Sequence, residues 1–127
     1  MGGYKKNKDG FIDIKIEKLI DWNEESGVGC ICSDKITKEG FKVGYMYRGK
    51  PIANCPDSGW IFMAGDEEYI GNPNKNHILD INTVCNYDKD IIPYIHSKIG
   101  SMYIRVDNKR FEIYDGTKPI FIAKQER

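Results

Sequence analysis

The chain has 127 residues, of which 40% are hydrophobic and 30% are charged, with a formal net charge of zero. This size and composition are typical of one globular domain and exclude a disordered or fibrous chain, so we expect a single domain over residues 1–127. The apolar runs are shorter than the ~20 residues that cross a bilayer, and no apolar signal-peptide segment follows the N-terminal lysines. The sequence therefore predicts a cytoplasmic protein without membrane contact.

The charges are unevenly distributed along the chain. Between residues 53 and 96 there are seven acidic and only two basic side chains, and the flanking segments are basic. An acidic middle argues against nucleic acid as the main partner, because binding to phosphates needs a basic surface. It favours a protein partner with a basic surface. The alternative is that the acidic loops only keep the surface solvated.

The first half of the chain predicts strands and one helical turn. Apolar and polar residues alternate over residues 11–16, which indicates a half-buried strand, and the apolar run at 28–32 indicates another. Residues 33–40 indicate a helical turn or a tight loop, because Ser33 or Asp34 can accept hydrogen bonds from the first free amides and Gly40 can end the turn. Residues 43–48 carry Val and Tyr at positions that suit a third strand.

The most apolar stretch is Trp60–Ala64, which predicts a central strand buried on both faces. Asp66, Glu67 and Glu68 follow it. Carboxylates are favoured where a helix begins, because of the unpaired amides and the helix dipole, so we expect a helix to start at Asp66.

The second half predicts helices followed by strands. Apolar residues recur every three or four positions over 78–86, which indicates an amphipathic helix, and a second short helix is expected at 91–96. Residues 99–106 and 110–114 predict a hairpin, and 119–123 a final strand. The fold class predicted is α+β, with a mostly antiparallel sheet and two or three short helices.

The three consecutive carboxylates Asp66, Glu67 and Glu68 allow three interpretations. The first is the helix start. The second is a metal site, but adjacent helical residues point about 100° apart and cannot converge on one ion without other donors. The third is a surface that faces a basic partner.

The segment from Asp57 to Trp60 contains a serine beside an acid, yet the sequence has no G-x-S-x-G elbow and no motif around either histidine. We therefore expect no Ser-His-Asp enzyme. We expect Asp57 and Ser58 to form a turn through bonds to the backbone, with Gly59 in an unusual dihedral. Trp60 would anchor the core, or alternatively form an exposed anchor for a partner.

The four cysteines are isolated apart from one C-x-C pair. In a cytosolic chain such residues are more often small buried hydrophobes than disulfides or ligands. A zinc site would require both histidines to converge on the pair. No nucleotide or catalytic zinc motif is present, so no cofactor or metal is expected. The residues concerned are Cys30, Cys32, Cys55, Cys85, His77 and His96.

Several motifs in chain order resemble a bacterial domain-of-unknown-function family that is catalogued as polymorphic-toxin immunity protein number thirty-three. The resemblance covers about residues 30–105, and residues 1–29 are expected to be an N-terminal strand and loop extension. The motifs are Ile31-Cys32-Ser33-Asp34-Lys35-Ile36, Met46-Tyr47-Arg48, Asp57-Ser58-Gly59-Trp60, Gly65-Asp66-Glu67, the segment from Ile81 to Ile91, and Ile99-Gly100-Ser101.

The resemblance implies an immunity protein, that is, a cytosolic antitoxin that binds a toxin domain and blocks it. Such a protein needs an exposed anchor and complementary charge to speed encounter. The alternative is a small ligand-binding or regulatory domain, with or without enzymatic activity, which a buried polar pair beside Trp60 together with a well-formed cavity would favour. The partner-binding candidates are Asp57, Trp60, Asp66, Glu67 and Glu68.

Overall fold

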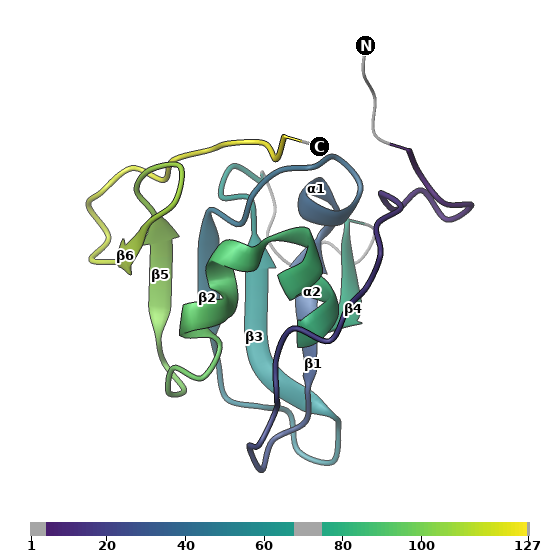
Figure 1. Ribbon diagram of the computed structural model, residues 1–127. Helices are drawn as coiled ribbons and strands as arrows, with labels where there is room; N and C mark the ends of the chain where they lie inside the picture. The colour runs from purple at the N-terminus through teal and green to yellow at the C-terminus, as the bar shows by residue number, and fades with distance from the viewer. Residues whose placement is uncertain (1–4, 68–74, 127) are drawn as a thin grey trace.

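The computed structural model describes residues 5–67 and 75–126. Their strands form one six-stranded sheet in the order β4-β1-β3-β2-β5-β6 (Figure 1). β1 and β3 are parallel and every other neighbouring pair is antiparallel, as the predicted fold class requires. The strands are β1 (Gly29–Ser33), β2 (Tyr45–Arg48), β3 (Asp57–Met63), β4 (Asn76–Asp80), β5 (Met102–Arg105) and β6 (Phe111–Ile113).

Three short helices lie on one face of this sheet: α1 (Asp34–Thr37), α2 (Ile81–Tyr87) and the 3-10 helix η1 (Lys89–Tyr94) (Figure 1). Alternate side chains of the strands point to this helix-covered face, because successive strand residues point to opposite sides. The core therefore forms between sheet and helices. Its buried members include Cys30, Cys32, Met46, Trp60, Phe62, Ile81, Val84 and Ile91.

The N-terminal segment lies outside α2 and joins the core without forming the predicted strand at 11–16. Among the described residues, the only β-bridge of this segment pairs Lys6 with Ile12. Ile12 is nevertheless buried, and its carbonyl accepts a hydrogen bond of 2.8 Å from the Tyr87 hydroxyl. The alternation of apolar and polar residues over 11–16 reflects an extended segment that packs one side against the helices. Such a segment shows the same two-residue period as a strand, even though it is not paired with a neighbouring strand.

Three other predicted elements also differ from the structure. Residues 78–80 belong to β4, and α2 starts at Ile81, where the Asp80 carboxylate accepts a hydrogen bond from the amide of Asn82. No helix starts at Asp66 or Glu67. Residues 119–123 form no strand, although the Phe121 amide donates to the Arg105 carbonyl. Apolar spacing over a few residues cannot separate a strand followed by a helix from a helix alone.

The other predicted elements are confirmed with small shifts of their ends. Ser33 caps α1 by accepting from the Lys35 amide at 3.2 Å. The strands expected at 28–32, 43–48 and 60–64 correspond to β1, β2 and β3. The predicted hairpin is formed by β5 and β6, and Asp107 accepts hydrogen bonds from two amides in its loop.

A buried ionic group ties β5 to η1. Arg105 is 0% exposed, and its guanidinium donates to Asp88 at 2.8 Å, to Asp90 at 2.9 Å and to the Val43 carbonyl at 2.7 Å. Asp88 also accepts from the Val43 amide at 2.8 Å. Burial raises the pKa of Asp88 above the usual 3.8, while the Arg105 charge and the Val43 amide limit the rise. These bonds fix the end of the sheet on which β2, β5 and η1 meet.

Candidate functional site

The structure confirms the turn chemistry predicted for the start of β3. The Asp57 carboxylate accepts hydrogen bonds from the amides of Ile52 at 2.7 Å and Gly59 at 3.0 Å. Gly59 has a φ of 89°, at a bulge where β3 shifts its register against β1. Ser58 donates to the Gly29 carbonyl across this bulge. Its hydroxyl therefore has a structural partner in the neighbouring strand.

Trp60 is in the core. Its side chain is 1% exposed, stacks on Phe62 with ring centroids 5.5 Å apart, and donates from its indole nitrogen to the Ile95 carbonyl at 2.8 Å. The first interpretation from the sequence, a core anchor, is therefore correct. Trp60 is not the exposed anchor that the second interpretation required.

The predicted carboxylates lie at the other end of β3. Asp66 is exposed and pairs with Lys35 at 2.8 Å. Glu67 turns its carboxylate back to the end of the strand, where it accepts from the amides of Ala64 and Gly65, both at 2.8 Å. Glu68 lies outside the described residues.

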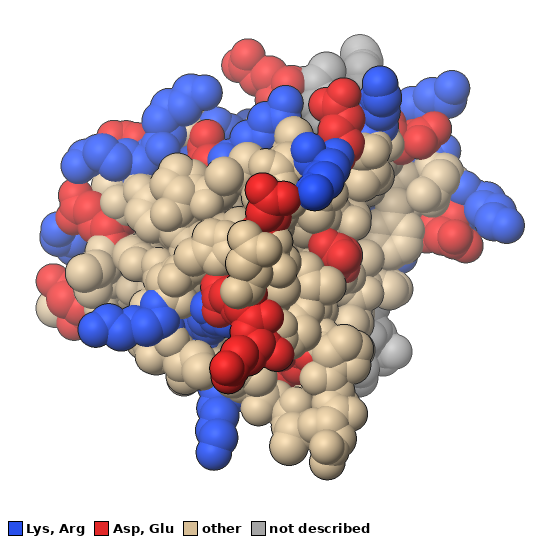
Figure 2. Space-filling view, turned by 60° about the horizontal axis from the view of Figure 1, so that its bottom comes forward, with Lys and Arg blue, Asp and Glu red and all other residues tan. Residues whose placement is uncertain are grey.

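The predicted binding residues do not form one patch. Asp57 is the first residue of the seven-residue strand β3 and Asp66 lies beyond its last residue, so the strand separates them by roughly 20 Å at about 3.3 Å per residue. Figure 2 turns the lower end of the molecule toward the viewer and shows a small group of acidic side chains near the middle, with Lys and Arg mostly toward the margins. No broad acidic surface is visible on this side. Contact of Asp57 and Asp66 with a partner remains a prediction.

The sheet face opposite the helices, here called the open face, carries an unexpected row of apolar side chains. The strand registers pair Ile78 with Ile31, Ile31 with Ile61, Ile61 with Tyr47, and Tyr47 with Met102. The five residues therefore lie side by side across β4, β1, β3, β2 and β5, and we call them the apolar row. None is buried: Ile78 is 82% exposed and Ile31 37%, and the other three are partly exposed.

The C-terminal segment covers only part of the open face. Tyr114 packs edge-on against Tyr45 with ring centroids 6.2 Å apart, and Ile120 lies against Gly44 and Gly65 at the end of β3. Met63, on the same face, is 1% exposed. The apolar row passes through Tyr47 and Ile61, each two residues from the covered Tyr45 and Met63 on the same strand. Among the described residues, no part of the C-terminal segment covers the row in this way. An antiparallel sheet with one solvated face normally places polar side chains there.

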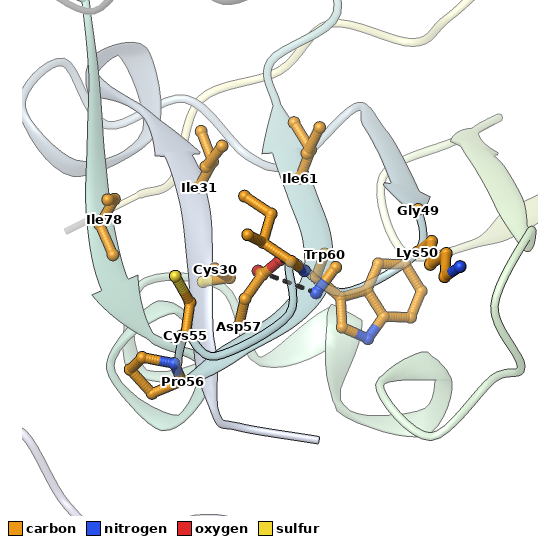
Figure 3. A pocket seen from close by; sticks show the side chains of 13 residues that line it. Cys30, Ile31, Gly49, Lys50, Cys55, Pro56, Asp57, Trp60, Ile61 and Ile78 are labelled. Atoms are coloured by element: carbon orange, nitrogen blue, oxygen red, sulfur yellow. Dashed lines mark hydrogen bonds between the residues drawn. The ribbon is translucent and has the colours of Figure 1, made fainter.

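A pocket of about 390 Å³ opens beside the apolar row, between β1, β3 and the loop that joins β2 to β3 (Figure 3). Ile31, Ile61 and Ile78 contribute side chains from three neighbouring strands, while Cys55 and Pro56 come from the loop. Only two charged residues, Lys50 and Asp57, are among its described lining residues. We call it the loop pocket. The Trp60 indole extends away from it, so Trp60 borders the pocket without filling it.

The sequence interpretation missed Ile61 because it expected the strand at 60–64 to be buried on both faces, and it missed Ile78 because it placed residues 78–86 in a helix. The apolar run that contains Ile31 was expected only to form a strand, with no exposed face assigned to it. The small number of predicted helices was a signal that could have revealed the exposed apolar face. Two or three short helices can cover only one face of a sheet with five or six strands, so the apolar residues on the other face needed a second explanation.

Histidines and cysteines do not converge in the structure. His77 bonds Asp34 at 2.6 Å, and His96 bonds Glu24 at 2.7 Å. The described residues contain no cluster of three or more potential metal-ligating side chains. Cys30, Cys32 and Cys85 are buried, and burial raises the pKa of each thiol, to about 12 for Cys85. Cys55 is exposed at the loop pocket.

No helix within residues 5–67 and 75–126 is long and apolar enough to cross a bilayer. Comparison with curated proteins and with solved structures finds no match. The family model described as the immunity protein Imm33 domain matches residues 30–115, well over half of the chain. This range contains every strand and helix of the described fold except Gly29, the first residue of β1. The chain therefore belongs to the Imm33 family of immunity protein domains.

Proposed function

We propose that this protein is a cytoplasmic immunity protein that binds a toxin domain and blocks it, without catalysing a reaction of its own. The observation that carries the proposal is membership of the immunity protein Imm33 family over residues 30–115. The open face supports it, because a contiguous exposed apolar surface with a polar rim is typical of protein-binding sites.

Neutralisation by binding requires a rigid surface more than reactive groups. The apolar row is built on regular strands, whose side chains are held at fixed spacing by the sheet registers. A protein that covers the active site of a toxin, or an element the toxin must move, blocks it by occupancy. Asp57 and Asp66 would then contribute at the margins, where charges mainly affect the rate of encounter.

Capture of the partner followed by a toxicity assay tests the proposal. The full chain is immobilised and exposed to lysate of its source at low salt, and retained proteins are identified by mass spectrometry. Each is then expressed in a bacterial host with and without this protein. Growth arrest that is relieved by the full chain is the expected result. A folded full chain whose captured proteins are all harmless, or whose toxic partner remains toxic, would contradict the proposal.

The loop pocket favours a second candidate function, binding of a small apolar molecule. Its volume of about 390 Å³ lies within the range of ligand pockets, ~300–1,000 Å³. Isotope-labelled protein titrated with indole and with short-chain fatty acids would test it. Saturable, micromolar binding that shifts the amides of Gly49, Gly59 and Ile61 would favour this second function. Changes only at millimolar concentration, or spread over the surface, would count against it.

A further inference from the structure

The apolar row is wider than a small ligand requires. It crosses five neighbouring strands, which are about 4.8 Å apart, so it extends over roughly 19 Å. Ile78 at one end is 82% exposed, and Tyr47 and Met102 continue the row beyond the residues that line the loop pocket. A drug-sized molecule in the pocket would leave Tyr47 and Met102 in water. A protein surface of ordinary interface size, ~800 Å² per partner, would cover them.

The charges around the row indicate the chemistry of its partner. The loop pocket has one basic and one acidic residue among its described lining residues, Lys50 and Asp57, and the row itself has none. A partner with a strongly charged centre would lose hydration here without gaining an opposite charge. The surface therefore fits an apolar, nearly neutral centre with a polar rim.

The loop pocket is preformed by backbone contacts. Gly29 and Gly59 bring chain segments together so closely that an added Cβ would lie 2.4 Å from the Pro56 carbonyl oxygen and 1.9 Å from that of Gly49, respectively. The bond from the Ile52 amide to Asp57 fixes the loop above them. A pocket held in this way loses little entropy when a side chain enters it, and buried apolar anchors in such pockets dominate interface energies.

We propose that the toxin docks on the open face along the apolar row and inserts a bulky apolar side chain into the loop pocket beside Cys55. This inference rests on the proposed function, since it assigns the surface and contact chemistry of the same partner. Asp57 fixes the loop wall of the pocket, and the row supplies the dry centre of the interface. The predicted acidic residue Asp66, beyond the other end of β3, lies outside this centre.

Two exposed isoleucines on the two edge strands provide a matched test. Ile78 on β4 is 82% exposed and belongs to the row, whereas Ile113 on β6 is 74% exposed and does not. Each is replaced by Lys, and the Kd for the captured toxin is measured by calorimetry. We expect Ile78→Lys to weaken binding at least about 30-fold, the effect of a hot-spot residue, and Ile113→Lys to change it less than about twofold. Because both side chains are exposed, neither variant should unfold.

The pocket itself is tested at Cys55. Cys55→Trp fills the mouth of the pocket and should weaken toxin binding at least about tenfold. In the unchanged chain, bound toxin should also slow alkylation of Cys55 by iodoacetamide. The buried thiols Cys30, Cys32 and Cys85 should not react in the folded protein, so the signal is specific.

The outcomes separate this inference from the proposed function. If the unchanged protein binds and neutralises the toxin, but Ile78→Lys and Cys55→Trp do so equally well and Cys55 remains reactive in the complex, the proposed surface is wrong and the immunity function stands. If the unchanged protein binds no toxin, both fail. Loss of binding in Ile78→Lys alone would retain the row and overturn insertion into the loop pocket.

Discussion

Single residues at the start of β3 determine the shape of the loop pocket. Gly59 has a φ of 89°, and an added Cβ would lie 1.9 Å from the Gly49 carbonyl oxygen. Gly116 has a similar φ of 86° but nothing within 4 Å of such a Cβ. A comparison of Gly59 with Gly116 separates two effects of an added side chain. Both positions would have backbone strain from the positive φ, but only Gly59 would also have a steric clash.

Gly59→Ala should therefore lower the free energy of unfolding much more than Gly116→Ala. Backbone strain alone costs ~1–3 kcal/mol, and the close approach of Gly49 adds to it at position 59. Urea unfolding of both variants measures the difference. Equal losses would show that the bulge relaxes to accept the methyl group.

Glu24 should make the free energy of unfolding decrease as the pH falls into the acid range. Burial raises the pKa of Glu24, but hydrogen bonds and charge from Arg48 and His96 together lower it below the usual 4.5. A lowered pKa contributes stability that is present above 4.5 and lost as the pH falls through the folded value. The urea midpoint should therefore fall from about pH 5 downward, and less steeply in Glu24→Gln. Glu25→Gln, at the exposed neighbour, should retain the steep fall.

At the scale of elements, the Arg105 group decides how β5 and η1 are joined. Asp88 is 1% exposed, and its substitution by Asn would leave the Arg105 charge without its closest carboxylate. Such losses cost ~3–5 kcal/mol. We expect Asp88→Asn to approach this cost in chemical unfolding. Asp107→Asn, which removes the charge of the exposed pair with Arg110 but keeps the acceptor for the loop amides, should cost less, because exposed ion pairs contribute little to stability.

Local sequence signals predicted those elements whose ends are fixed by nearby side chains. Ser33 caps α1 and Asp107 closes the loop of the β5–β6 hairpin, and both were predictable from residue type and spacing. The start of α2 was not, because Ile78 and Ile81 fit a helical period although Ile78 belongs to β4. The pairing of β4 with β1 is a contact between distant segments, and it overrides the local period.

At the scale of the whole molecule, the segment before β1 is held on α2 by asparagines. Asn82 accepts hydrogen bonds from the amides of Leu19 at 2.7 Å and Ile20 at 3.3 Å, and donates to the Glu17 carbonyl at 2.8 Å. Asn86 adds further bonds to Glu17. This part of the chain lies outside the region matched by the family and closes one side of its core.

Asn82→Ala should release this segment locally, because two backbone amides lose their acceptor. Hydrogen exchange at Leu19 and Ile20 should accelerate at least about tenfold, while amides of β3 remain protected. Asn23→Ala, at an exposed position of the same segment, is the control. Uniform acceleration over the sheet would instead show that the segment and the core open together.

The sequence by itself determined the class of the protein: the α+β composition of elements, the turn at Asp57 and Gly59, the core role available to Trp60, and the resemblance to an immunity family. These depend on residue types and short spacings, which act locally. The tertiary structure alone decided that Ile78, Ile31, Ile61, Tyr47 and Met102 meet in one row on an open face, and that Asp57 and Asp66 lie apart. Strand order and register join segments far apart in the chain, and no local pattern encodes which face the helices leave uncovered.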